Sequence, residues 1–135
     1  MTSTTNTTVL LIARIMLGLL FVVSGFGKTG DVAGFAGYMA SGGIPAFLAW
    51  PVILFEILGG LALIVGFQTR GVAIALAAFT LLAGILYHFQ PADQNQMTQF
   101  LKNLAITGGY LAIAITGAGA WSIDGFRGNA KTVNA

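Results

Sequence analysis

Four long apolar runs constrain most strongly what this chain can fold into. A helix needs about 20 mostly apolar residues to cross the hydrocarbon core of a bilayer, which is about 30 Å thick. The runs cover residues 9–26, 46–67, 71–88 and 97–117. Backbone polar groups in lipid must be satisfied within their own segment, so each run predicts a helix. We therefore expect an all-α integral membrane four-helix bundle.

The composition excludes several other classes of protein. Only 7% of the 135 residues are charged, whereas ordinary globular domains carry about 25% and need them to cover their surface. The six basic residues are scattered, which gives no sign of a nucleic-acid partner. The chain has no cysteine and therefore no disulfide, thiolate metal site or dithiol chemistry. We expect a single membrane domain with disordered tails at residues 1–8 and 122–135.

The connection between the first two runs predicts a short amphipathic helix. Thr29 or Asp31 can cap a helix at its start, Gly42-Gly43 can end it, and Pro45 can open the next span. The apolar residues that follow the cap at helical spacing are Val32, Phe35, Ala36 and Met39. We expect this helix to lie at the membrane interface as a lid over the bundle, with a structureless loop as the alternative.

Basic residues in the short loops predict the orientation in the membrane. With four spans both termini share one side, which carries Arg70, Arg127 and Lys131, whereas the other side carries Lys28. We expect a multi-pass protein of the cell (inner) membrane, with both termini cytoplasmic and the lid on the outer face. Arg14 near the cytoplasmic end of the first span is interpreted as an anchor that snorkels to the head groups.

Ionisable residues inside spans are energetically costly and therefore mark candidate sites. Glu56 and Lys102 each lie about five residues inside helices that start on the lid side, roughly 8 Å below that surface at 1.5 Å per residue. Lys28 and His88 end their helices on the same side, and Asn103 follows Lys102. We expect these five residues to form one polar cluster, with Glu56 paired to Lys102 across two helices.

The cluster has two interpretations. The pair of Glu56 and Lys102 is either a structural clasp between helices or, together with His88, a site that binds a polar head group or relays a proton. One histidine with scattered carboxylates is not a familiar ligand set, so we expect no metal. No nucleophile–base pair, phosphate loop or dinucleotide fingerprint occurs in the sequence, and we expect no catalytic activity from this chain on its own.

Several different short motifs follow one another along the chain. The first span contains Arg14-x3-Gly18-x2-Phe21-x3-Gly25-x2-Lys28. The later motifs are Gly43-Ile44-Pro45, Glu56-x2-Gly59-Gly60, Gly66 with Arg70, His88, and Lys102-Asn103-Leu104. Their order and spacing resemble the DoxX family of small four-helix membrane proteins, over about residues 9 to 120.

The resemblance implies a role in redox metabolism. The family takes its name from similarity to a subunit of an archaeal membrane complex linked to thiosulfate and quinone oxidation. It implies an accessory subunit of a redox-linked system, a quinone as the candidate cofactor, and a redox protein as a candidate partner besides the lipid bilayer and further copies of the chain. Dithiol exchange does not transfer, because the chain has no cysteine. A small transporter or channel for a polar solute and a structural membrane scaffold are the alternatives.

Overall fold

The computed structural model describes residues 2–133 as a chain of helices without strands, which confirms the all-α prediction for this part of the chain. The elements are α1 (Ser3–Lys28), α2 (Val32–Ser41), the 3-10 turn η1 (Ala46–Leu48), α3 (Ala49–Val65), α4 (Thr69–Ala83), the π-helical segment η2 (Gly84–His88), α5 (Gln94–Thr116) and α6 (Ile123–Val133). Among the described residues, three stretches are long and apolar enough to cross a membrane: Ser3–Lys28, Ala46–Val65 and Thr69–His88.

The fourth predicted span corresponds to α5, which is not among those three stretches. Its 23 residues give it sufficient length, but it begins with polar residues and carries Lys102 and Asn103 further along. α5 nevertheless packs along α4 over most of its length and completes a bundle of four long helices. The bundle is thus present, whereas the apolar character of its fourth helix is weaker than the sequence interpretation required.

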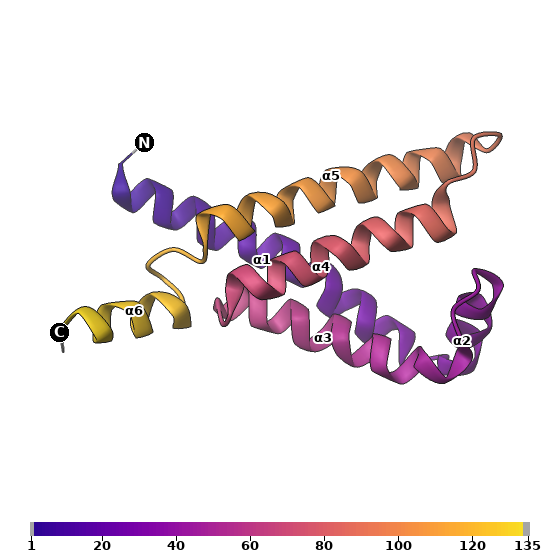
Figure 1. The fold of residues 1–135 in the computed structure, drawn as a ribbon, viewed down its shortest axis with the longest axis horizontal. Helices are drawn as coiled ribbons and strands as arrows, with labels where there is room; N and C mark the ends of the chain where they lie inside the picture. The colour runs from indigo at the N-terminus through magenta and orange to yellow at the C-terminus, as the bar shows by residue number, and fades with distance from the viewer. Residues whose placement is uncertain (1, 134–135) are drawn as a thin grey trace.

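The four long helices form two antiparallel pairs (Figure 1). α1 packs chiefly against α3, and α4 packs chiefly against α5. Both chain ends lie at one end of the bundle, and α2 lies at the other. We call these the terminal end and the lid end.

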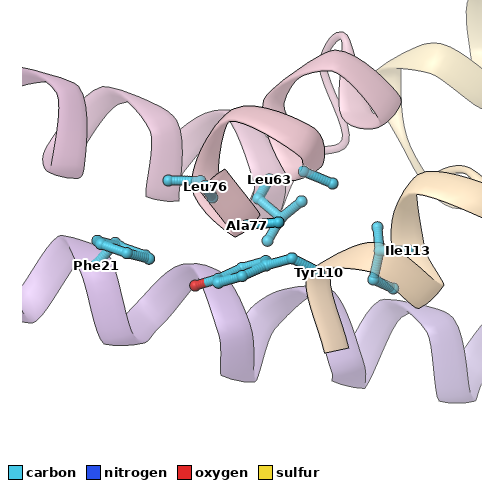
Figure 2. Close-up of a cluster of buried hydrophobic side chains, with 7 residues drawn as sticks. Phe21, Leu63, Leu76, Ala77, Tyr110 and Ile113 are labelled. Carbon is cyan, nitrogen blue, oxygen red and sulfur yellow. The ribbon is translucent and has the colours of Figure 1, made fainter. Parts of the chain in front are cut away.

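One apolar cluster joins all four helices in the middle of the bundle (Figure 2). Its buried members are Phe21, Leu63, Ala73, Leu76, Ala77, Tyr110 and Ile113. Tyr110 is fully buried, and its hydroxyl donates a hydrogen bond of 2.9 Å to the carbonyl of Leu17. This bond satisfies the polar end of the side chain and connects α5 to α1.

Glycines allow the backbones of α1 and α3 to touch. A Cβ atom on Gly18 would lie 2.5 Å from the carbonyl oxygen of Gly60, and a Cβ atom on Gly60 would lie 2.5 Å from that of Gly18. Only residues without side chains permit this approach, as is common between helices in membranes. Gly108 on α5, by contrast, has no neighbouring atom within 4 Å of its Cβ position.

The predicted lid helix is present as α2, so the alternative of a structureless loop is wrong. Asp31 caps its start by accepting a hydrogen bond of 2.9 Å from the amide of Gly34. Gly42 caps its end, and the next residue, Gly43, has φ +88°, a conformation that favours glycine. Local capping rules therefore set both ends of the lid.

The predicted disordered tails are wrong for the described residues. Residues 3–8 belong to α1, whose start is capped by Thr2 accepting from the amide of Thr5 at 3.1 Å. Ile123–Val133 forms α6, while residues 1, 134 and 135 lie outside the described part. The tails are ordered because a side chain satisfies the first free amides of α1 and because Asp124 bonds α6 to the bundle.

Asp124 and Arg70 close the terminal end of the bundle. The two carboxylate oxygens of Asp124 accept hydrogen bonds from the amides of Gln68 and Thr69 at 2.9 and 2.8 Å, which caps α4. Arg70 donates to the carbonyl of Ala114 at 2.9 Å, near the end of α5. A carboxylate at the start of a helix and a cation at its end both interact favourably with the helix dipole. Together with Arg14, these two residues form what we call the terminal clasp.

Arg14 is the buried member of the terminal clasp. Its side chain is 0% exposed, and one terminal nitrogen donates to the carbonyl of Trp121. Gly66 leaves space for the guanidinium, because a Cβ atom there would overlap it. The interpretation of Arg14 as a snorkelling anchor is therefore wrong. The segment before α6 folds over the guanidinium and covers it.

Candidate functional site

A cavity of about 530 Å³ lies at the lid end of the bundle. Its walls come from α1, α2, α3, α4, η2 and α5, and most of the lining residues are apolar. The five residues predicted to cluster all line it: Lys28, Glu56, His88, Lys102 and Asn103. Residues from helices far apart in the sequence thus line one cavity at the lid end, the side of the bundle on which they were predicted to lie.

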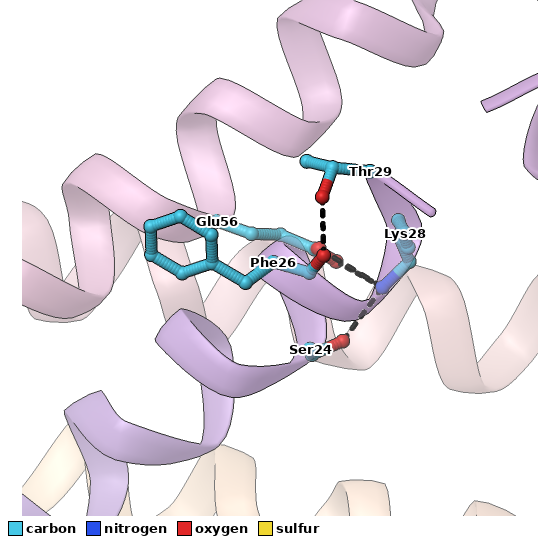
Figure 3. A network of polar contacts seen from close by, with 5 residues as sticks. All are labelled: Ser24, Phe26, Lys28, Thr29 and Glu56. Atoms are coloured by element: carbon cyan, nitrogen blue, oxygen red, sulfur yellow. Dashed lines mark hydrogen bonds and ion pairs between the residues drawn. The ribbon is translucent and has the colours of Figure 1, made fainter. Parts of the chain in front are cut away.

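Glu56, the one acid that lines this cavity, is paired with Lys28 (Figure 3). Glu56 is only 3% exposed, and its two carboxylate oxygens accept hydrogen bonds of 3.0 and 2.9 Å from the ammonium of Lys28. The same ammonium donates to the hydroxyl of Ser24 at 2.6 Å. A buried carboxylate requires such a partner, because desolvation of an unpaired charge is strongly unfavourable.

The predicted pairing of Glu56 with Lys102 is therefore wrong. Helix packing explains the difference, since α3 lies directly against α1 while α5 packs on α4. Gly25 permits this contact, because a Cβ atom there would lie 3.2 Å from the Cβ of Glu56. Lys102 lines the same cavity from α5 but makes no ion pair with any acid among the described side chains.

Asn103 is held by α4. Its side-chain amide donates to the carbonyl of Thr80 at 3.2 Å. Gly84 makes room for this approach, because a Cβ atom there would lie 3.1 Å from the Cβ of Asn103. The bond fixes the orientation of the amide and leaves its carbonyl oxygen as an acceptor at the cavity wall.

His88 ends the π-helical segment η2 and bonds to the next connection. Its Nδ1 lies 2.8 Å from the side-chain oxygen of Gln96. With that oxygen as acceptor, Nδ1 carries the proton and Nε2 keeps a lone pair, an assignment that follows from the bonding pattern. π-helical segments are rare and frequent at functional sites.

Two tyrosines hold the lid against this segment, and we call them the tyrosine latch. The hydroxyl of Tyr87 on η2 donates to the carbonyl of Met39 on α2 at 2.7 Å. Its ring stacks on that of Tyr38, with ring centres 4.7 Å apart. These two tyrosines were not among the residues predicted for the site. A pairing of rings between separate segments leaves no local pattern, and the π-helical turn that aims Tyr87 has no clear sequence signal.

The site offers hydrogen-bond donors and acceptors rather than a metal-binding set. Within the described residues, no group of three or more His, Asp or Glu side chains could hold a metal ion. Charged and amide groups from α1, α3 and α5 surround an apolar interior. Such an arrangement suits an amphiphilic molecule with a small polar head.

Comparisons with known proteins agree with the architecture. The chain is 47% identical to inner membrane protein YqjF of Escherichia coli (strain K12), over 84% of this chain and 88% of that protein. It is 36% identical to inner membrane protein YphA of the same organism, over 85% and 87% of the two chains. It is 30% identical to the putative oxidoreductase CatD of Bacillus subtilis (strain 168), over 86% and 84%.

The family comparison covers more than half of the chain. No solved structure matches this chain. The family model described as DoxX matches residues 9–89, from α1 through the end of η2, and so includes Lys28, Glu56 and His88. The three relatives are each at least 30% identical to the chain over more than four fifths of their length. This chain is a membrane protein of the DoxX family.

Proposed function

We propose that this protein is an accessory membrane subunit of a redox-linked system and that its lid-end cavity binds the head group of a quinone. The cavity itself is the observation that carries the proposal. Its volume of about 530 Å³ lies within the range of roughly 300–1,000 Å³ that is typical of small-molecule sites. The apolar walls suit the ring, and the bilayer would receive the tail.

The polar residues supply complementary roles toward a quinone. Each carbonyl oxygen of the ring is an acceptor, and the ammonium of Lys102 and the amide of Asn103 supply donors from α5. Glu56 can accept a further hydrogen bond or a proton, because each carboxylate oxygen has more than one lone pair. His88 can exchange a proton through its unbonded nitrogen.

The redox assignment is supported by one relative and by the family resemblance. CatD of Bacillus subtilis is named a putative oxidoreductase. The proposal includes a separate redox protein as partner, with further copies of the chain as a second kind of assembly. Purification in mild detergent with crosslinking tests for both: a co-purifying redox protein supports the accessory role.

The transport alternative requires polar groups along the bundle axis. Instead, the apolar cluster around Phe21, Leu76 and Tyr110 lies between the cavity and the terminal clasp. We also propose that the termini face the cytoplasm and the lid faces outward, because Arg70 and Arg127 lie at the terminal end. Modification of cysteines introduced singly into α2 and α6 by a membrane-impermeant reagent tests this orientation.

The binding experiment uses the protein in lipid nanodiscs with decylubiquinone as the probe. Glu56→Gln keeps the shape of the side chain and removes its charge, and we expect it to abolish binding while the thermal unfolding profile still shows a folded protein. Asp31→Asn is the matched control, because it also neutralises one acid but keeps a capping side chain on the lid. Normal binding by Glu56→Gln would show that the site is wrongly assigned.

A further inference from the structure

The charges around the cavity do not balance. Lys28 and Lys102 both line it, and Glu56 is the one carboxylate among the lining residues. With His88 neutral, two positive charges and one negative charge leave an excess of one positive charge. The excess can be assigned to a particular side chain.

Lys28 and Glu56 form a closed unit. An ammonium group has three protons to donate, and those of Lys28 are directed to the two oxygens of Glu56 and to the hydroxyl of Ser24, at 3.0, 2.9 and 2.6 Å. The pair is neutral overall and keeps no free donor. A ligand that needed a cation from this wall would have to break one of these bonds.

Lys102 supplies the excess charge. It projects from α5, on the wall that belongs to the α4–α5 pair, and it has no hydrogen bond or ion pair with any side chain that the structure describes. Lys102 is exposed, so water can satisfy its ammonium group, but no carboxylate among the described residues supplies a counter-charge. A negatively charged group in the cavity would provide that counter-charge.

We infer that the cavity prefers a quinone whose head group carries a single negative charge, such as an ionised ring hydroxyl, over a neutral quinone. Lys102 is the residue that determines this preference. The inference rests on the proposed quinone site and specifies its ligand class. The ionised oxygen lies toward Lys102, while the uncharged part of the ring lies against the neutral Lys28–Glu56 unit.

A matched pair of ligands tests the preference. A 2-hydroxy-3-alkyl-1,4-naphthoquinone is ionised at neutral pH, whereas its 2-methyl ether has the same ring and tail but no charge. Affinities for both are measured in nanodiscs with wild type, Lys102→Met, Lys102→Arg and Arg127→Met. The last variant removes one cation at the terminal end and controls for the net charge of the protein.

We expect wild type to bind the ionised ligand about tenfold more tightly than the ether, the value of one added charge-assisted hydrogen bond. Lys102→Met should abolish the preference, while Lys102→Arg and Arg127→Met keep it. Equal binding of both ligands by wild type, or a preference that survives Lys102→Met, overturns the inference and leaves the quinone site intact. Failure of wild type to bind either ligand overturns the proposed function together with this inference.

Discussion

Replacing Lys28 by Met should strongly destabilise the protein at neutral pH, by an amount that the site geometry sets. The carboxylate of Glu56 is almost fully buried and loses its ion-pair partner in this variant. It then either stays charged without a partner or takes up a proton. Breaking a buried ion pair in this way costs about 3–5 kcal/mol.

Protonation limits that loss and gives it a pH dependence. At pH 7, protonating a carboxyl with the ordinary glutamate pKa of about 4.3 costs about 4 kcal/mol, and at pH 5 it costs about 1 kcal/mol. The destabilisation caused by Lys28→Met should therefore shrink between these pH values. The change in the free energy of unfolding is measured by titration of detergent micelles with SDS, followed by circular dichroism.

Two further variants make the measurement decisive. The double change Lys28→Met with Glu56→Leu removes both charges and should restore the stability to within about 1 kcal/mol of wild type, since apolar replacement of a buried pair is often neutral or stabilising. Lys102→Met is the matched control and should change stability by about 0.5 kcal/mol or less. A small effect of Lys28→Met that does not depend on pH would refute the reasoning, and so would a large effect of Lys102→Met.

Single substitutions test the helix packing, the lid and the terminal clasp. Gly60→Ala should destabilise the bundle by about 1–3 kcal/mol, because its methyl group would overlap the backbone of α1. Gly108→Ala, whose methyl group meets no atom, should be neutral or stabilising by up to about 1 kcal/mol. Equal effects of the two variants would contradict the close contact between α1 and α3. Tyr87→Phe removes a bond to the lid worth about 1 kcal/mol, so hydrogen exchange in α2 should become several-fold faster, and unchanged exchange would argue against the tyrosine latch. Burial raises the pKa of Asp124, but two backbone amides and a nearby arginine outweigh this effect and hold the pKa below the ordinary 3.8. The stabilisation by this carboxylate is complete above 3.8 and is lost as the pH falls through the lowered pKa. Melting temperatures between about pH 6 and 3 should therefore fall more steeply for wild type than for Asp124→Asn.

Helix capping and the constant rise of a helix were sufficient to predict the lid helix and the grouping of its neighbouring polar residues from the sequence. Asp31 and Gly42 mark the ends of the lid helix because capping depends on neighbouring residues alone. The constant rise of a helix placed Glu56, Lys102 and Asn103 at one depth, and the structure brings them to one cavity. Depth along a helix can thus be calculated from a sequence without knowledge of its neighbours.

The choice of partner could not be predicted in the same way. Depth favoured Lys102 as the partner, whereas the observed pairing of Glu56 with Lys28 depends on which helices lie side by side. That neighbourhood follows from contacts such as Gly18 against Gly60, between residues far apart in the chain. The terminal clasp was missed for a related reason, since Asp124 occurs in a polar segment whose composition resembles a disordered tail.

The two ends of the bundle differ in the contacts that hold them together, and this difference predicts which end separates more easily. At the terminal end, hydrogen bonds between backbone groups and the side chains of Arg14, Arg70 and Asp124 link α1, α4, α5 and α6. At the lid end, the two helix pairs surround a space and are bridged largely by side chains. We therefore expect that, if the cavity widens, the two helix pairs separate at the lid end while the hydrogen bonds at the terminal end stay in place.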